Sequence, residues 1–179
     1  MDVIRFFAPV NNQTAQRLVS ALDALRSRGA NSVHLLLATT GGSTDAGIAV
    51  HNFIKASGLN TTAVNMGVVA SIGIVIFCAA ARRISMPQAR FTLHPNVFNI
   101  QNESLGAHQL QEKANQLTIE HEAIAGIIGA ATGKSIEDAE GLILGHRSLS
   151  ANEAREFGIV HEVEAFQVPR DAKLVAIDA

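Results

Sequence analysis

Residues 33–56 read VHLLLATTGGSTDAGIAVHNFIKA, and this stretch decides the fold class. It opens with six residues that are apolar except for His34, and then Gly41 and Gly42 interrupt the pattern. The residues after the two glycines fit a helix. A strand, a tight glycine turn and a helix in direct succession are typical of a parallel sheet with crossover helices. A strand that is apolar on both faces indicates that both sides of this sheet are covered.

The same alternation continues on both sides of this stretch, so we expect repeated β-α-β units. In chain order the predicted elements are strand 3–7, a helix from cap residues 11–14 to about residue 28, strand 33–38, helix 44–56, strand 61–66, helix 71–81, and short extended segments at 83–85 and 91–94.

The second half of the chain opens with a long predicted helix, at about residues 105–131, whose apolar residues form one stripe. A second helix starts at Ser135, and residues 150–153 form a capping box for a third helix that ends near Gly158. A strand over 159–163 follows, and from about residue 164 we expect a tail or an edge strand. No linker or repeat interrupts the chain, so we expect one domain over residues 1–179.

Composition and charge indicate which partners and which cellular compartment the protein has. The net charge of −2 supplies no field that would draw the protein to nucleic acid or anionic lipid. The longest apolar run, residues 68–81, is too short to span a bilayer. No secretory signal precedes it, and the single cysteine, Cys78, fits a reducing compartment. We therefore expect a cytoplasmic protein that binds neither nucleic acid nor membranes.

Three turns carry the residues that suit nucleophilic chemistry. Ser71 lies at a predicted strand-to-helix turn, where free backbone N–H groups can stabilise an oxyanion. The turn at Gly41 and Gly42 can bring a second N–H close, and His94, just before Pro95, is placed to act as a general base. Each signal also fits a structural role, since a serine that opens a helix is commonly an N-cap.

Together these residues resemble a known family, the Clp protease proteolytic subunit, a serine peptidase of family S14 with the Clp/crotonase fold. Four stretches carry the resemblance, in the same order: residues 40–47 (TGGSTDAG), 66–73 (MGVVASIG), 86–95 (MPQARFTLHP) and 149–160 (LSANEAREFGIV).

The resemblance implies an α/β fold of stacked β-α-β units with a protruding long helix, a homo-oligomeric ring, and a peptide or unfolded-protein substrate. By the same resemblance Ser71 is the nucleophile and His94 the base. Four further residues have implied roles, namely the oxyanion donors Gly42 and Ile72 and the substrate-flanking Ser43 and Thr44.

Three departures from the family pattern bear on function. His146 stands where the family has its catalytic aspartate, and a neutral imidazole can accept the Nδ1 proton of His94 but adds no negative charge. We expect reduced activity unless the third member of the triad is supplied by His146 or by a nearby carboxylate such as Asp138 or Glu140. Thr40 replaces a proline. The chain begins at the first core strand, so the resemblance does not extend to partnership with an ATPase unfoldase.

Two alternatives stay open. One is a catalytically degenerate Clp-like scaffold or peptide-binding ring protein, and the other is a crotonase-like acyl-coenzyme A enzyme in which the same amides hold an enolate. No cofactor is expected. No metal is expected either, because the spacing of the remaining histidines suits no metal site. They include His34, His51, His108 and His161.

Overall fold

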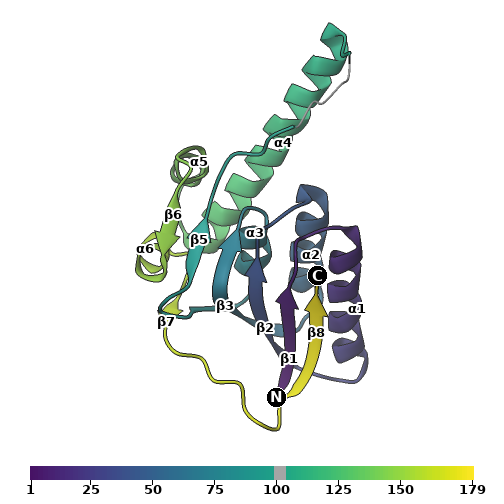
Figure 1. Ribbon diagram of the computed structural model, residues 1–179, viewed down its shortest axis with the longest axis vertical. Coiled ribbons are helices and arrows are strands. Elements are labelled where there is room, and N and C mark those ends of the chain that lie inside the picture. The colour runs from purple at the N-terminus through teal and green to yellow at the C-terminus, as the bar shows by residue number, and fades with distance from the viewer. Residues whose placement is uncertain (99–103) are drawn as a thin grey trace.

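The computed structural model describes residues 1–98 and 104–179. Strands and helices alternate through its first half, as expected from the sequence (Figure 1). The elements in chain order are β1 (Asp2–Phe7), α1 (Asn12–Ser27), β2 (Ser32–Thr39), α2 (Thr44–Ala56), β3 (Asn60–Ala70), α3 (Gly73–Cys78), β4 (Arg82–Ser85), β5 (Arg90–Thr92), α4 (Ala107–Thr132), α5 (Ile136–Leu144), β6 (Ser148–Ser150), α6 (Ala151–Phe157), β7 (Glu162–Val163) and β8 (Lys173–Asp178).

The strands form one mainly parallel sheet in the order β6-β5-β3-β2-β1-β8. The long strand β3 pairs with β4 along Thr62–Asn65 and then with β5 along Val68–Ala70. β7 pairs with β4, and β6 runs antiparallel to β5. Parallel pairing puts the carboxyl ends of β2, β3 and β5 at one edge, which is where α/β sheets place their sites.

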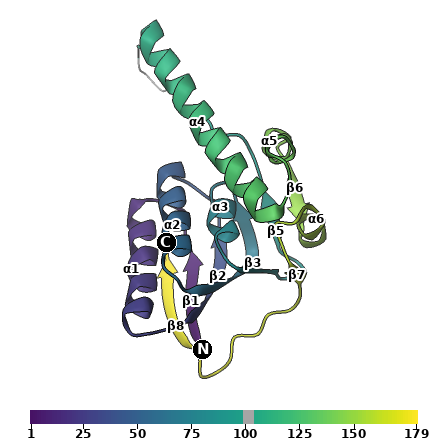
Figure 2. The same cartoon turned by 180° about the vertical axis from the view of Figure 1, so that it is seen from behind.

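Helices α1, α2 and α3 cover one face of the sheet (Figure 2). Leu35 and Leu37 of β2 belong to the main core cluster with these helices, whereas Leu36 lies on the other face with Val64 and Ile84. The segment between β7 and β8 packs on that second face through Phe166. This two-sided burial explains why β2 is apolar throughout rather than alternating.

The long helix α4 extends well beyond the sheet (Figure 1). It was expected at about residues 105–131 and runs from Ala107 to Thr132. Only its carboxyl-terminal half is buried, through residues such as Ile124 and Ile128, while Leu110 near its start is 48% exposed. The apolar stripe read from the sequence therefore contributes to the core of this chain along part of its length only.

The carboxyl-terminal residues form an edge strand. β8 pairs in parallel with β1, and Arg5 of β1 lies 2.6 Å from the carboxylate of Asp178. Ile177 is the buried residue of this strand. Within residues 1–98 and 104–179, no helix combines the length and the apolar character needed to cross a bilayer.

Arg83 joins the ends of three helices. Its guanidinium donates to the carbonyl oxygens of Ala80 after α3, Ala131 near the end of α4, and Gly158 and Ile159 after α6, at 2.7–3.3 Å. The residue is only 5% exposed, and this burial lowers the pKa of Arg83. The neighbouring Arg82 instead pairs with Glu162 at the surface, 2.6 Å away.

Candidate active site

Ser71 occupies a strained turn between β3 and α3. Its φ is 54°, in the left-handed region that costs a residue other than glycine about 1 kcal/mol or more. The turn is held by a hydrogen bond from the Ser71 N–H to Thr92 O on β5, at 2.8 Å. The N-cap of α3 is Ile72 rather than Ser71. In the described part of the chain the Ser71 hydroxyl makes no hydrogen bond, so the N-cap explanation of this serine fails.

The turn at Gly41 and Gly42 packs directly against Ser71. A Cβ atom added to Gly41 would lie 2.6 Å from the Cβ of Ser71, and one added to Gly42 would overlap the carbonyl oxygen of Val10. Their φ angles are 84° and 147°, where side chains are strained. Hydrogen bonds of 2.8 Å, from the Val10 N–H to Gly41 O and from the Ser43 N–H to Val10 O, hold the turn. Glycine is therefore required at both positions for this close approach.

Two backbone N–H groups, one directly after Ser71 and one in the glycine turn that packs against it, are unused. Among residues 1–98 and 104–179, no acceptor pairs with the N–H of Gly42 or Ile72, whereas Gly41 donates to Thr39 Oγ1 at 3.1 Å. The Ile72 nitrogen lies 3.3 Å from the place of a Gly41 Cβ, so the glycine turn adjoins this amide. Unpaired N–H groups next to a hydroxyl are the elements of an oxyanion hole.

His94 follows β5 and is half-buried. Its Nδ1 lies 2.9 Å from the carbonyl oxygen of Pro95. A carbonyl oxygen only accepts hydrogen bonds, so Nδ1 carries the proton in the neutral ring and Nε2 keeps a free lone pair. That tautomer is the one a general base needs.

His146 lies near His94 without touching it. The two ring centroids are 6.2 Å apart, and no hydrogen bond joins the rings in the described residues. His146 is exposed, in the turn after α5, and has a φ of 49°. The rings of His146 and His94 are thus neighbours, but Nδ1 of His94 is bonded to Pro95 O. The assignment of His146 as third triad member stays a prediction.

Ser43 and Thr44, expected to flank a substrate, begin helix α2. The Ser43 hydroxyl accepts from the Ala46 N–H at 3.3 Å and caps the helix. The Ser43 N–H already donates to Val10 O, so the backbone of Ser43 has no free donor for a peptide. The Thr44 hydroxyl accepts from the side chain of Asn96 at 3.2 Å. Their role at a substrate stays a prediction.

Ser71 and His94 line one narrow hollow. Its open volume is about 10 Å³, barely room for one water molecule. No hydrogen bond joins Ser71 to His94 among the described residues, and such bonds commonly tighten only when substrate is bound. Asn96 and His121 also line the hollow and were not singled out from the sequence. The remaining lining residues are apolar: Ile72, Leu93, Ile124, Ile128 and Ile143.

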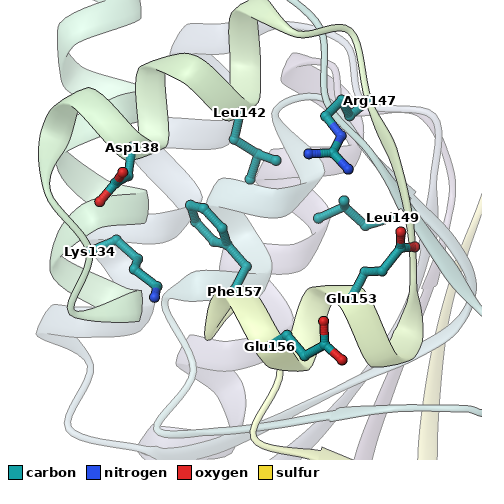
Figure 3. A pocket seen from close by; sticks show the side chains of 8 residues that line it. All are labelled: Lys134, Asp138, Leu142, Arg147, Leu149, Glu153, Glu156 and Phe157. Carbon is teal, nitrogen blue, oxygen red and sulfur yellow. The ribbon is translucent and has the colours of Figure 1, made fainter.

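A second hollow, of about 310 Å³, lies between α5, β6 and α6 (Figure 3). Charged side chains of both signs line it, and Lys134 lies 5.9 Å from the centre of the Phe157 ring. The Glu153 carboxylate already accepts two hydrogen bonds from Ser150, which lower its pKa. Neither Ser71 nor His94 faces this hollow, so it is no part of the candidate site. The described residues contain no cluster of His, Cys, Asp or Glu suited to a metal ion.

The sequence model of the Clp protease family, described as Clp protease, matches residues 2–166. The chain belongs to the Clp protease family. Two curated relatives, each named ATP-dependent Clp protease proteolytic subunit 3, come from Rhizobium johnstonii and Rhizobium etli. Each is 27% identical over 166 residues, a match that covers 92% of this chain and 84% of the relative.

Solved structures of Clp proteases have the same fold. A point mutant of ClpP1 from Listeria monocytogenes superposes with a TM-score of 0.83 at 27% identity. The ClpP1 structure from the same organism gives a TM-score of 0.79 at 28% identity, and both matches cover 92% of each chain. The resemblance and the α/β fold read from the sequence are confirmed. The chain therefore belongs to a family of serine peptidases whose members form homo-oligomeric rings.

Proposed function

We propose that this Clp protease is a serine peptidase in which Ser71 is the nucleophile and His94 the general base, with the N–H groups of Gly42 and Ile72 as the oxyanion hole. The observation that carries the proposal is the strained turn at Ser71, whose hydroxyl caps no helix and lies beside two unused amides. Residues held in a strained backbone conformation cluster at functional sites. The substrate class is peptides and unfolded protein segments.

The chemistry follows from the positions of the groups. Nε2 of His94 takes the proton of the Ser71 hydroxyl as Oγ attacks the peptide carbonyl carbon. The carbonyl oxygen becomes an anion, which the N–H groups of Gly42 and Ile72 stabilise. His94 then gives its proton to the leaving amine as the C–N bond breaks, and the acyl group stays on Ser71. Water, activated by His94 in turn, releases the acid and restores the enzyme.

The environment of the reacting groups also supports binding of an extended peptide. Ser43 and Thr44 lie at the start of α2, directly after the glycine turn, so a peptide bound at the oxyanion hole would pass beside them. The apolar walls of the hollow suit an apolar side chain next to the cleaved bond.

The proposed setting of the enzyme is a homo-oligomeric ring in the cytoplasm. In the first half of α4, which extends beyond the sheet, Leu110 and Ile119 are 48% and 67% exposed, so this chain alone leaves these two apolar side chains uncovered. Cys78, the single cysteine, is buried, which raises the pKa of its thiol to about 11 and keeps it unreactive. A chain with one cysteine forms no internal disulfide, which suits a reducing compartment.

Labelling with a fluorophosphonate probe tests the nucleophile. We expect the wild-type protein to be labelled at Ser71, because the probe phosphonylates serine, with loss of fluoride, only where a base and an oxyanion hole activate the hydroxyl. The S71A variant should take no label, and S20A, which changes an exposed serine on α1, should be labelled as the wild type. An unlabelled wild type, or equal labelling of S71A, would refute the assignment. Mass spectrometry of the modified peptide identifies the site.

We further propose that turnover is reduced because no carboxylate of residues 1–98 and 104–179 contacts His94, and the H146D variant tests this. At the ring separation of 6.2 Å, a carboxylate would stabilise the imidazolium by more than 1 kcal/mol even after partial solvent screening. We expect kcat to rise about tenfold. Aspartate tolerates the left-handed backbone at this position.

The matched control for H146D is H146N, which has the same shape without the charge. Asparagine should leave kcat within about twofold of the wild type, since it supplies no charge to the imidazolium. Equal rates for the two variants would show that the missing charge does not limit turnover. Hydrolysis of a fluorogenic peptide measures kcat for both variants and for the wild type.

A further inference from the structure

Asn96 connects the segment after His94 to two helices. Its side-chain Nδ2 donates to Oε2 of Glu120 on α4, at 2.8 Å, and to the hydroxyl of Thr44 at the start of α2, at 3.2 Å. All of these groups are partly buried. Two helices that are far apart in the chain thus hold one amide group, two residues after the candidate base.

The Glu120 carboxylate is itself fixed. Its second oxygen, Oε1, accepts from the side-chain amide of Gln116, one helical turn earlier, at 2.8 Å. Each carboxylate oxygen therefore has one donor, and the hydrogen bond to Asn96 is of the charge-assisted kind, which is stronger than a neutral one. The anchor for Asn96 is therefore a Glu120 carboxylate that accepts a hydrogen bond at both oxygens.

Between His94 and Asn96 lies one residue, Pro95, whose carbonyl oxygen contacts His94 Nδ1 at 2.9 Å. Proline has a fixed φ. The direction of the Pro95 carbonyl therefore depends mainly on ψ of Pro95, the torsion that also sets the position of Asn96. Anchoring the Asn96 side chain restricts that torsion. A backbone carbonyl can fix the tautomer of a catalytic imidazole as a carboxylate does, although without a full charge.

We propose that Asn96, held by Glu120 and Thr44, is a positioning residue that keeps the Pro95 carbonyl on His94 Nδ1 and so sets the tautomer of the base through a backbone carbonyl. The inference rests on the proposed function for the role of His94 in catalysis. The tautomer itself is a property of the resting protein. It can be measured whether or not Ser71 reacts.

Solid-state ¹⁵N NMR of the sedimented full-length protein, labelled at histidine, reads the tautomer directly, and the His94 signal is assigned by its loss in H94Q. In the wild type we expect Nδ1 protonated and Nε2 unprotonated. N96A and E120A should give a mixture of tautomers, whereas E120Q, which keeps an acceptor oxygen, should preserve most of the wild-type form. The matched control is N115A, which breaks an exposed hydrogen bond of the same kind on α4, from Gln111 at 3.0 Å.

Kinetics give the second readout. In N96A and E120A we expect kcat to fall about tenfold to a hundredfold with KM nearly unchanged, because a misplaced base slows the chemical step and not binding. N115A should retain wild-type values. A wild type protonated at Nε2, or an N96A variant with the wild-type tautomer, would overturn the inference. Failure of Ser71 to take the fluorophosphonate label would instead overturn the proposed function, so the two failures are distinguishable.

Discussion

Replacing His94 with alanine should lower kcat for peptide hydrolysis by about 10⁴ to 10⁶, because the Ser71 hydroxyl is a weak nucleophile once its base is gone. The S71A variant should show the same decrease in kcat. The double variant S71A/H94A should lose no more than either single one, since the two side chains act as one unit in the same step. KM should change little, because neither side chain holds the substrate in the ground state.

Steady-state hydrolysis of a fluorogenic peptide, with S20A as the control for a harmless serine substitution, measures these effects. The kcat of the double variant is the decisive measurement. If its loss were the product of the two single losses, Ser71 and His94 would contribute independently, and a nucleophile–base pair would be excluded. Residual activity of H94A above about a tenth of the wild type would equally contradict the role of His94 as base.

Replacing Arg83 with methionine should reduce the free energy of unfolding by about 3–5 kcal/mol. The guanidinium is buried and supplies hydrogen bonds to four carbonyl oxygens at the ends of α3, α4 and α6. Methionine fills similar space but leaves these oxygens without a donor, and each buried unpaired group costs about 1–3 kcal/mol. Since α4 also lines the hollow beside Ser71, we expect activity to decline together with stability.

The adjacent arginine provides the matched control. Arg82 is half-exposed and its ion pair with Glu162 lies at the surface, so R82M should cost less than about 1 kcal/mol. Urea unfolding followed by far-ultraviolet circular dichroism suits this chain, which has no tryptophan or tyrosine for fluorescence. All variants are compared at one protein concentration, because oligomers unfold in a concentration-dependent way. Equal midpoints for R83M and R82M would refute the role of Arg83.

Local pattern was enough to predict most elements. The helix α2 has the bounds expected from the sequence, Thr44–Ala56, because a capping serine and an apolar face are local signals. The region around Ser71 differs. β3 was expected to end at residue 66 and continues to Ala70, and the helix expected over 71–81 is only Gly73–Cys78. The cause is pairing of β3 with β5, a contact between segments 22 residues apart that no local pattern records.

The same distinction applies to the site. Ser71, His94 and the glycine pair were recognisable because each lies in a motif, and the family resemblance that those motifs carry is confirmed. Asn96 and Glu120 were not recognised, although Asn96 is two residues from His94. Their hydrogen bond joins residues 24 positions apart, and it exists only because α4 passes over the segment after β5.

Sequence alone thus determined the family, the order of strands and helices, and the serine, histidine and glycines of the candidate site, because motifs and periodicity are written in neighbouring residues. The tertiary structure decided which backbone amides stay free beside Ser71 and which atom meets Nδ1 of His94. It also decided that Arg83 donates hydrogen bonds at the ends of three helices. These features depend on the directions of groups brought together from distant segments, and hydrogen bonds are made or lost over less than 1 Å.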